Sequence, residues 1–271
     1  MAKKHIDWGQ IASTPLTREL ASHRDPQMPI TLASKRIYYA LHEAAHLLTA
    51  ARYNVPVHTV TLIDHRGQFA YLNEPGPCAG SVRTFYTADT PNAAVAFAGC
   101  EYESIYCKTD TNIAAVEDLT AGLQTLCEAT RSPFGGVLYG AEEGALQPEA
   151  RRIRQEVRSL LIEKWALIDA CATAFLLFTN TKGELDGRKT GELIAHIRAD
   201  GRLPMACRSR NPDQLHASLG VDITTHWRSF VCIDAADKFD ARAKQISARH
   251  PLGYRRLMAL KQVEIYASKI S

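Results

Sequence analysis

Five consecutive residues, His42-Glu43-Ala44-Ala45-His46, have types and a spacing that suit metal chemistry. On an α-helix of about 3.6 residues per turn, side chains at positions i and i+4 project from one face, so both imidazoles can reach a single Zn²⁺. Glu43 then lies beside the metal, where it can hold a zinc-bound water and take its proton as a general base. The motif therefore predicts a hydrolytic zinc site.

The sequence around the motif predicts the helix that must carry it. Apolar residues recur at helical spacing over residues 34–53, where Ser34 can cap the start and Asn54 with Pro56 ends the helix. The stripe expected to face the core consists of Ile37, Leu41, Ala44 and Leu48.

A change of period after this helix predicts two strands. Residues 57–63 are rich in β-branched side chains, and a turn at Arg66-Gly67 leads to a second short run over residues 68–72. Because the first strand follows the zinc helix directly, we expect its edge, around residues 60–63, to pair with an extended substrate. A loop should follow and continue toward Pro91, since turn-forming residues gather at Pro75, Gly76, Pro77 and Gly80.

Helical patterns occupy most of the remaining chain, which predicts a mainly α fold with a small β-hairpin or sheet beside the zinc helix. The expected helices cover residues 93–107, 113–130 and 148–178, one starts near Thr190, and others follow residue 203, the last over about residues 251–270.

A catalytic zinc takes three protein ligands and leaves one position for water, so a third ligand must come from another segment. A structural site would instead close its shell with four ligands rich in cysteine, and no cysteine lies near this helix in sequence. Asp118 stands out because its helical face is surrounded by small residues, which let two helices approach closely: Ala114, Ala121 and Gly122. The other candidates are Glu101, Glu103, Glu117, His58 and His65.

Beyond the motif, several segments resemble, in the same order, the peptidase domain of the FtsH-type ATP-dependent membrane proteases. Residues 39–47 look like the zinc helix of that family, and residues 57–71 resemble its strand-turn-strand. Three later segments are also similar: Ala98-Gly99-Cys100-Glu101-Tyr102-Glu103 to its glycine-rich segment, residues 111–121 to the stretch with its aspartate ligand, and Leu185-Asp186-Gly187 to its leucine-aspartate-glycine. The resemblance covers about residues 35–200.

The resemblance implies a role for each matching residue. His42, His46 and Asp118 would be the zinc ligands, Glu43 the general base, and Glu103 a supporting residue near the zinc helix. It also implies a helical zinc-peptidase domain over residues 31–203. An N-terminal arm over residues 1–30 and a basic helical extension over residues 204–271 would flank that domain.

The chain departs from the family pattern in three respects. Ala45 stands where the family motif has glycine, and Cys100 replaces the arginine of the glycine-rich segment. No G-x-x-x-x-G-K-[ST] phosphate loop is present, so this chain alone cannot couple ATP hydrolysis to the unfolding of substrates.

Composition limits the classes of partner and the cellular compartment that the chain can have. The 271 residues carry a net charge of +3, a near balance that disfavours nucleic acid as the main partner. We read no export signal and no membrane segment, because the longest nearly apolar stretch, residues 165–178, is shorter than the ~20 residues that a span requires. Seven widely spread cysteines without a C-x-x-C pair fit a reduced cytoplasm.

The sequence thus predicts a zinc-dependent metalloendopeptidase that cleaves peptides or unfolded proteins through a Glu-activated zinc-bound water, without ATP. The alternative is a non-hydrolytic binding or regulatory protein that keeps a zinc-peptidase fold. In that case the tail from residue 206, with 11 basic and 6 acidic residues, could direct it to an acidic or nucleic-acid partner. An intact Glu43 favours the enzyme.

Overall fold

The computed structural model describes residues 5–16, 20, 30–63, 79–107, 113–130 and 146–200. The helices are α1 (Trp8–Ser13), α3 (Ile30–Arg52), α4 (Thr90–Tyr102), α5 (Ile113–Thr130), α7 (Leu146–Glu163), α8 (Trp165–Phe178) and α9 (Gly187–Arg198), and a π-helical turn, Glu103–Cys107, follows α4. The strands are β1 (Val57–Ile63), β2 (Ala79–Thr84) and β3 (Glu184–Leu185). The predicted mainly α fold with a small sheet is confirmed for these residues.

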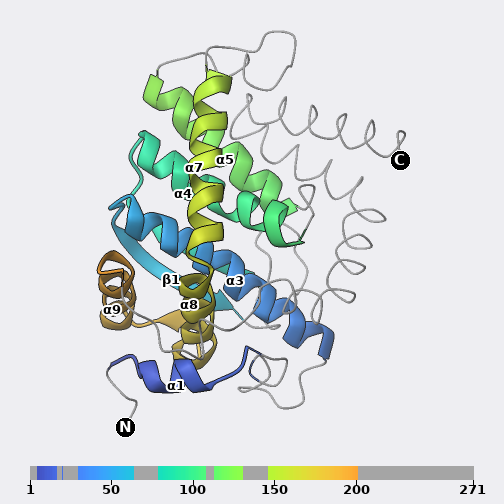
Figure 1. Ribbon diagram of the computed structural model, residues 1–271, viewed down its shortest axis with the longest axis vertical. Coiled ribbons are helices and arrows are strands. Elements are labelled where there is room, and N and C mark those ends of the chain that lie inside the picture. Colours follow the sequence, from blue (N-terminus) through green and yellow to red (C-terminus); the bar gives the residue numbers. More distant parts are fainter. Residues whose placement is uncertain are drawn as a thin grey trace.

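Helix α3 crosses the middle of the molecule, and α4, α8, α9 and β2 pack against it (Figure 1). All four residues of its predicted apolar stripe are fully buried. The helix ends where the sequence indicated: Asn54 adopts φ 57°, a left-handed conformation that asparagine tolerates, and the Val55 N–H donates to the Ala50 carbonyl. The motif-bearing helix is therefore the centre of the core.

The three strands form one antiparallel sheet in the order β2-β1-β3. Strand β1 is confirmed, and the predicted second strand over residues 68–72 lies outside the described residues. The expected loop through residues 79–84 is wrong: this segment is β2, paired with β1 from Ala79 opposite Ile63 to Thr84 opposite Val57. Pairing with a buried neighbour overrides the turn tendency of its glycine.

Strand β1 occupies the middle of the sheet, which corrects the expectation that its edge receives substrate. On one side it pairs with β2, and on the other Val60 and Thr61 lie opposite β3 while the Leu62 N–H donates to the Gly183 carbonyl. Among the described residues, the unpaired edge near α3 belongs to β2.

Some helix boundaries differ from those expected. Helix α5 has the predicted bounds, whereas α4 begins at Thr90, where the Asp89 carboxylate caps it by accepting from the Asn92 N–H. Helix α9 begins at Gly187, three residues before the expected start, because Asp186 caps it. These carboxylate caps satisfy N–H groups that the first turn of a helix leaves without partners.

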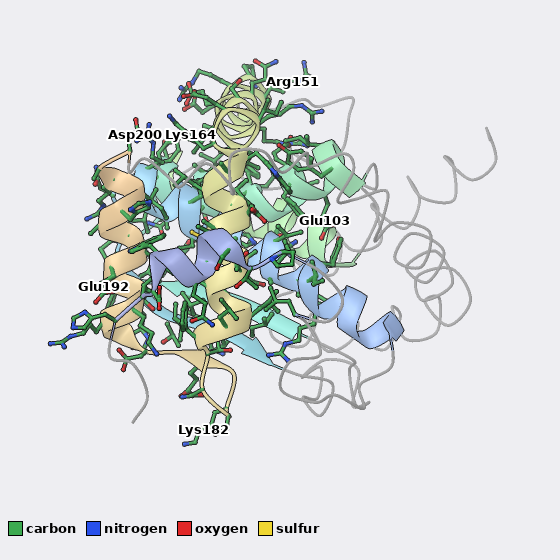
Figure 2. All side chains as sticks on the ribbon, turned by 60° about the horizontal axis from the view of Figure 1, so that its bottom comes forward. Glu103, Arg151, Lys164, Lys182, Glu192 and Asp200 are labelled. Atoms are coloured by element: carbon green, nitrogen blue, oxygen red, sulfur yellow. The ribbon has the colours of Figure 1, made fainter. Side chains whose placement is uncertain are left out.

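The single helix expected over residues 148–178 is wrong, because Lys164 interrupts it with φ −106° and ψ 26°. Helix α7 is amphipathic, whereas α8 is buried along most of its length. The break lets the chain turn from a surface helix into a core helix. Lys164 also lies 3.3 Å from the Asp200 carboxylate at the end of α9 (Figure 2).

The described part of the N-terminal arm packs on the body. The Trp8 ring stacks on His196 of α9 at 3.9 Å. The Ile6 N–H donates to Glu192 of the same helix, a residue labelled in Figure 2. No helix in the described ranges combines the length and apolar content that a membrane span requires. The predicted C-terminal extension lies outside the described residues.

Candidate metal centre

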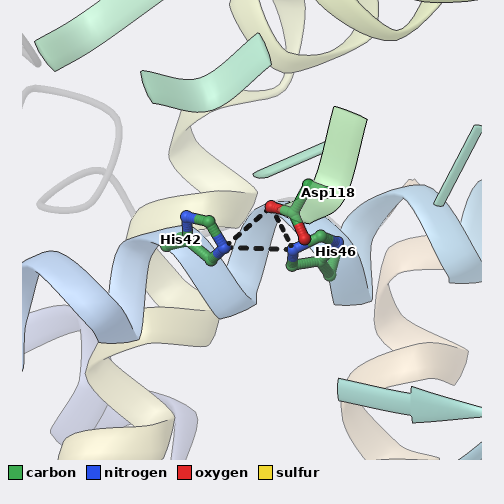
Figure 3. Close-up of side chains that lie close together, drawn as sticks. All are labelled: His42, His46 and Asp118. Atoms are coloured by element: carbon green, nitrogen blue, oxygen red, sulfur yellow. Dashed lines mark hydrogen bonds and ion pairs between the residues drawn. The ribbon is translucent and has the colours of Figure 1, made fainter. Parts of the chain in front are cut away.

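Three side chains predicted as metal ligands come together between α3 and α5 (Figure 3). The Nε2 atoms of His42 and His46 are 3.2 Å apart, and Oδ2 of Asp118 lies 3.2 Å from the first and 3.4 Å from the second. The three atoms thus form a compact triangle. One metal ion could be held by this group.

The outer nitrogen of each imidazole faces an oxygen atom, and of the two contacts only that of His46 is aligned as a hydrogen bond. Nδ1 of His46 lies 2.8 Å from the Val95 carbonyl, and Nδ1 of His42 lies 2.9 Å from Oε1 of Glu103. Glu103 in turn accepts a hydrogen bond from the Tyr38 hydroxyl. Such outer partners fix the tautomer and orientation of metal-binding histidines. The structure therefore brings Glu103 to a position that suits its predicted supporting role.

The arrangement of lone pairs fits a cation. A carbonyl can only accept, so Nδ1 of His46 carries the hydrogen and its Nε2 presents a lone pair toward the triangle. Oδ2 of Asp118 is buried, and no well-aligned hydrogen bond from the described residues satisfies it. Because imidazole nitrogen and carboxylate oxygen are common zinc ligands, this donor set fits Zn²⁺.

Two glycines that the sequence did not connect with the metal site make this closeness possible. A Cβ on Gly99 of α4 would lie 1.9 Å from Oδ2 of Asp118 and 2.5 Å from Cε1 of His42. A Cβ on Gly80 of β2 would lie 2.3 Å from Cγ of Glu43. The signal available in the sequence was glycine inside an element, which often marks a close approach.

The small residues near Asp118 were expected to bring its helix close to the zinc helix, and the contact described for Gly122 is with α4 instead. Gly122 lies against the Phe97 ring of α4, where a Cβ would be 2.4 Å from the ring, so it allows α5 to pack closely on α4. Ala121 is exposed, and the side chain of Ala114 lies outside the description. Among the described small residues, Gly122 thus takes part in the packing of α5 on α4, and Ala121 does not.

Of the remaining candidate ligands, Glu101 and His58 are described, and neither is part of this group. Glu101 lies 2.5 Å from Nε of Arg154 and 3.4 Å from Arg158, both on α7. His58 is exposed on β1, next to the Phe85 ring. The side chain of Glu117 and the whole of His65 lie outside the described residues.

The electrostatics of the triangle favour positive charge. Burial disfavours the charged form of His42, yet contacts with Asp118 and Glu103 outweigh it and raise its pKa well above the ordinary value. For His46, burial is likewise outweighed by Asp118, and its pKa is raised. Burial would raise the pKa of Asp118, but the two histidines lower it to about 2. Without metal, these shifts favour the protonated form of the histidines.

A bound metal must displace these protons, because only neutral imidazole is a ligand. We expect Zn²⁺ binding at pH 7 to release protons, and the apparent affinity to rise about tenfold per pH unit for each proton released. Calorimetric titration with Zn²⁺ at one pH, in buffers of different ionisation enthalpy, measures the number released. Heats that do not depend on the buffer would contradict the electrostatics described above.

Glu43 lies next to the triangle but is not one of its corners. It is 5% exposed, and the Val82 N–H of β2 faces its carboxylate. Burial raises its pKa, although the two histidines and the Val82 N–H oppose this effect. A buried carboxylate with a raised pKa beside a metal site is suited to accept a proton.

Comparison of the chain with protein-family models, with curated proteins and with solved structures finds no match in any of the three. The resemblance to FtsH-type peptidases stays a prediction from the motifs quoted above.

Proposed function

We propose that the chain is a zinc-dependent endopeptidase of the FtsH-like type that cleaves peptides or unfolded proteins. One observation carries the proposal: the donor atoms of His42, His46 and Asp118 converge on one point, and the carboxylate of Glu43 lies beside it without being a corner of the triangle. A site that needed only to hold a metal would have no use for this fourth group.

Each side chain has a distinct part in the reaction. When bound, zinc would polarise the scissile carbonyl and acidify a water molecule. Glu43 takes the proton from the attacking water and delivers it to the leaving amine. The Val95 carbonyl and Glu103 hold the two imidazoles in the orientation that the ligand set requires.

The free edge of β2 is the natural place for an extended substrate. This strand packs on α3, and its Gly80 and Val82 lie against Glu43. A peptide that adds to this edge through main-chain groups other than the Val82 N–H, which faces Glu43, would run past the general base. In this proposal the substrate pairs with β2 and not, as the sequence suggested, with β1.

Removal and restoration of the metal test the proposal. A chelator should abolish hydrolysis of a reduced, alkylated protein substrate, and stoichiometric Zn²⁺ should restore it. Asp118→Asn should weaken zinc binding by more than the 10- to 100-fold typical of outer-shell changes, because it removes the anionic corner of the described triangle. Fluorescence competition with a zinc indicator gives the affinity.

Glu101→Gln is the matched control, since Glu101 faces arginines of α7 and should leave the zinc affinity unchanged. A larger loss of zinc affinity in Glu101→Gln than in Asp118→Asn would contradict the assignment of Asp118 as the third ligand. Zinc bound at full stoichiometry without hydrolysis of any peptide would favour the non-hydrolytic binding protein.

A further inference from the structure

We infer that residues 80–82 of β2 position the Glu43 carboxylate, so that Gly80 and Val82 are positioning residues for the general base; this inference rests on the proposed function. Neither residue belongs to the zinc-binding motif, and 37 positions separate Glu43 from Gly80 along the chain. Two independent contacts carry the inference, one steric and one polar.

The steric contact is with Gly80. A Cβ at this position would lie 2.3 Å from Cγ, 2.8 Å from Cδ and 2.7 Å from Oε1 of Glu43. Gly183 is the only glycine with positive φ among the described residues, so Gly80 has a backbone that any residue can adopt. The absence of a side chain is therefore needed for space and not for conformation.

The polar contact is with Val82, whose N–H faces the Glu43 carboxylate and favours its charged form. Val82 lies opposite Val60 of β1, but an N–H that points to Glu43 points away from β1. It therefore belongs to the free edge of the strand and has no part in the ladder. In antiparallel pairs, alternate residues present their main-chain groups outward in this way.

Together the contacts restrict a side chain that has several rotatable bonds. Gly80 lies against the middle of the Glu43 side chain, and Val82 holds its end. A general base must stay within hydrogen-bond reach of the water that it deprotonates, and a displacement of about 1 Å can cost about 100-fold in rate. Strand β2 would thus supply the precision that the helix alone does not.

A double-mutant cycle on stability tests the steric contact without reference to activity. Gly80→Ala should lower the melting temperature by about 4 °C or more when Glu43 is present, because the new methyl group overpacks the site. In the Glu43→Ala background the same change should have no effect or a small stabilising one. Gly191→Ala, where a Cβ meets nothing within 4 Å, is the control. Equal effects of Gly80→Ala in both backgrounds would overturn the inference.

Kinetics test the positioning itself. In Gly80→Ala, kcat should fall about 100-fold while KM and zinc content change little. Val82→Pro removes the donor but no ladder hydrogen bond, since proline is accepted on edge strands, and kcat should fall about tenfold. Losses confined to KM, or to zinc content, would contradict a positioning role. A wild type without hydrolytic activity would refute the proposed function. The stability cycle would still show whether position 80 contacts Glu43.

Discussion

Glu43→Gln should retain zinc and lose turnover by about 10²- to 10⁴-fold, the range that a positioned general base contributes. The amide has the size of the carboxylate and can still accept a hydrogen bond from the Val82 N–H, but it cannot take up a proton. Because Glu43 is not a corner of the donor triangle, the metal affinity should stay the same. Turnover of an unfolded protein and the zinc content of the same preparation are the two measurements.

Glu163→Gln is a matched control, since Glu163 is 69% exposed and pairs with its neighbour Lys164. It should behave as wild type in both measurements. Unchanged hydrolysis in Glu43→Gln would refute the proposed mechanism. Loss of zinc together with turnover would instead mean that Glu43 is a ligand.

Gly99→Ala should weaken zinc binding at least 100-fold, although Gly99 is no ligand. Its new Cβ would lie 1.9 Å from the Asp118 carboxylate and within 2.6 Å of Nε2 of His42, so both donors must move. Overpacking of this kind costs about 1–3 kcal/mol of stability, and misplaced donors should cost at least 100-fold in zinc affinity, about 2.7 kcal/mol. Zinc affinity and the free energy of unfolding measure the two effects separately.

Gly191→Ala in α9 is again the control, because it places the same methyl group in open space on a helix. It should leave zinc binding intact and increase stability slightly, as alanine exceeds glycine in helix propensity. Wild-type zinc affinity in Gly99→Ala would show that the ligands do not need the close approach of α4.

The parts of the site that depend on one helix could be predicted from the sequence. The relation of His42 to His46 follows from the spacing of side chains along α3, and burial of the apolar stripe follows from the same period. Neither requires knowledge of where other elements lie. Local geometry was sufficient.

The third corner of the triangle depends on packing between distant segments, and residue type alone left several acids open. Glu101 and Asp118 are both carboxylates on neighbouring helices. Glu101 faces two arginines of α7, more than 50 residues later in the chain, whereas Asp118 faces the histidines. This choice is made by how α4 sits between α5 and α7, which no single stretch of sequence specifies.

Backbone contributions were the least predictable part. The Val95 carbonyl and the Val82 N–H have no side-chain signature, because every residue except proline carries both groups. Strand β2 itself was expected to be a loop, since its glycine and the prolines before it indicate turns. Its pairing with β1 forms only when the chain is folded.

The three corners of the triangle differ in their access to solvent. The side chains of His42 and His46 are 4% and 10% exposed, whereas that of Asp118 is 21% exposed. The histidines lie on α3, which is buried in the core and unfolds only with it. Asp118 lies on α5, and its side chain is more exposed to solvent. Metal exchange should therefore begin with detachment of this carboxylate, so that the lifetime of the bound ion depends on motion of α5 rather than on the stability of α3.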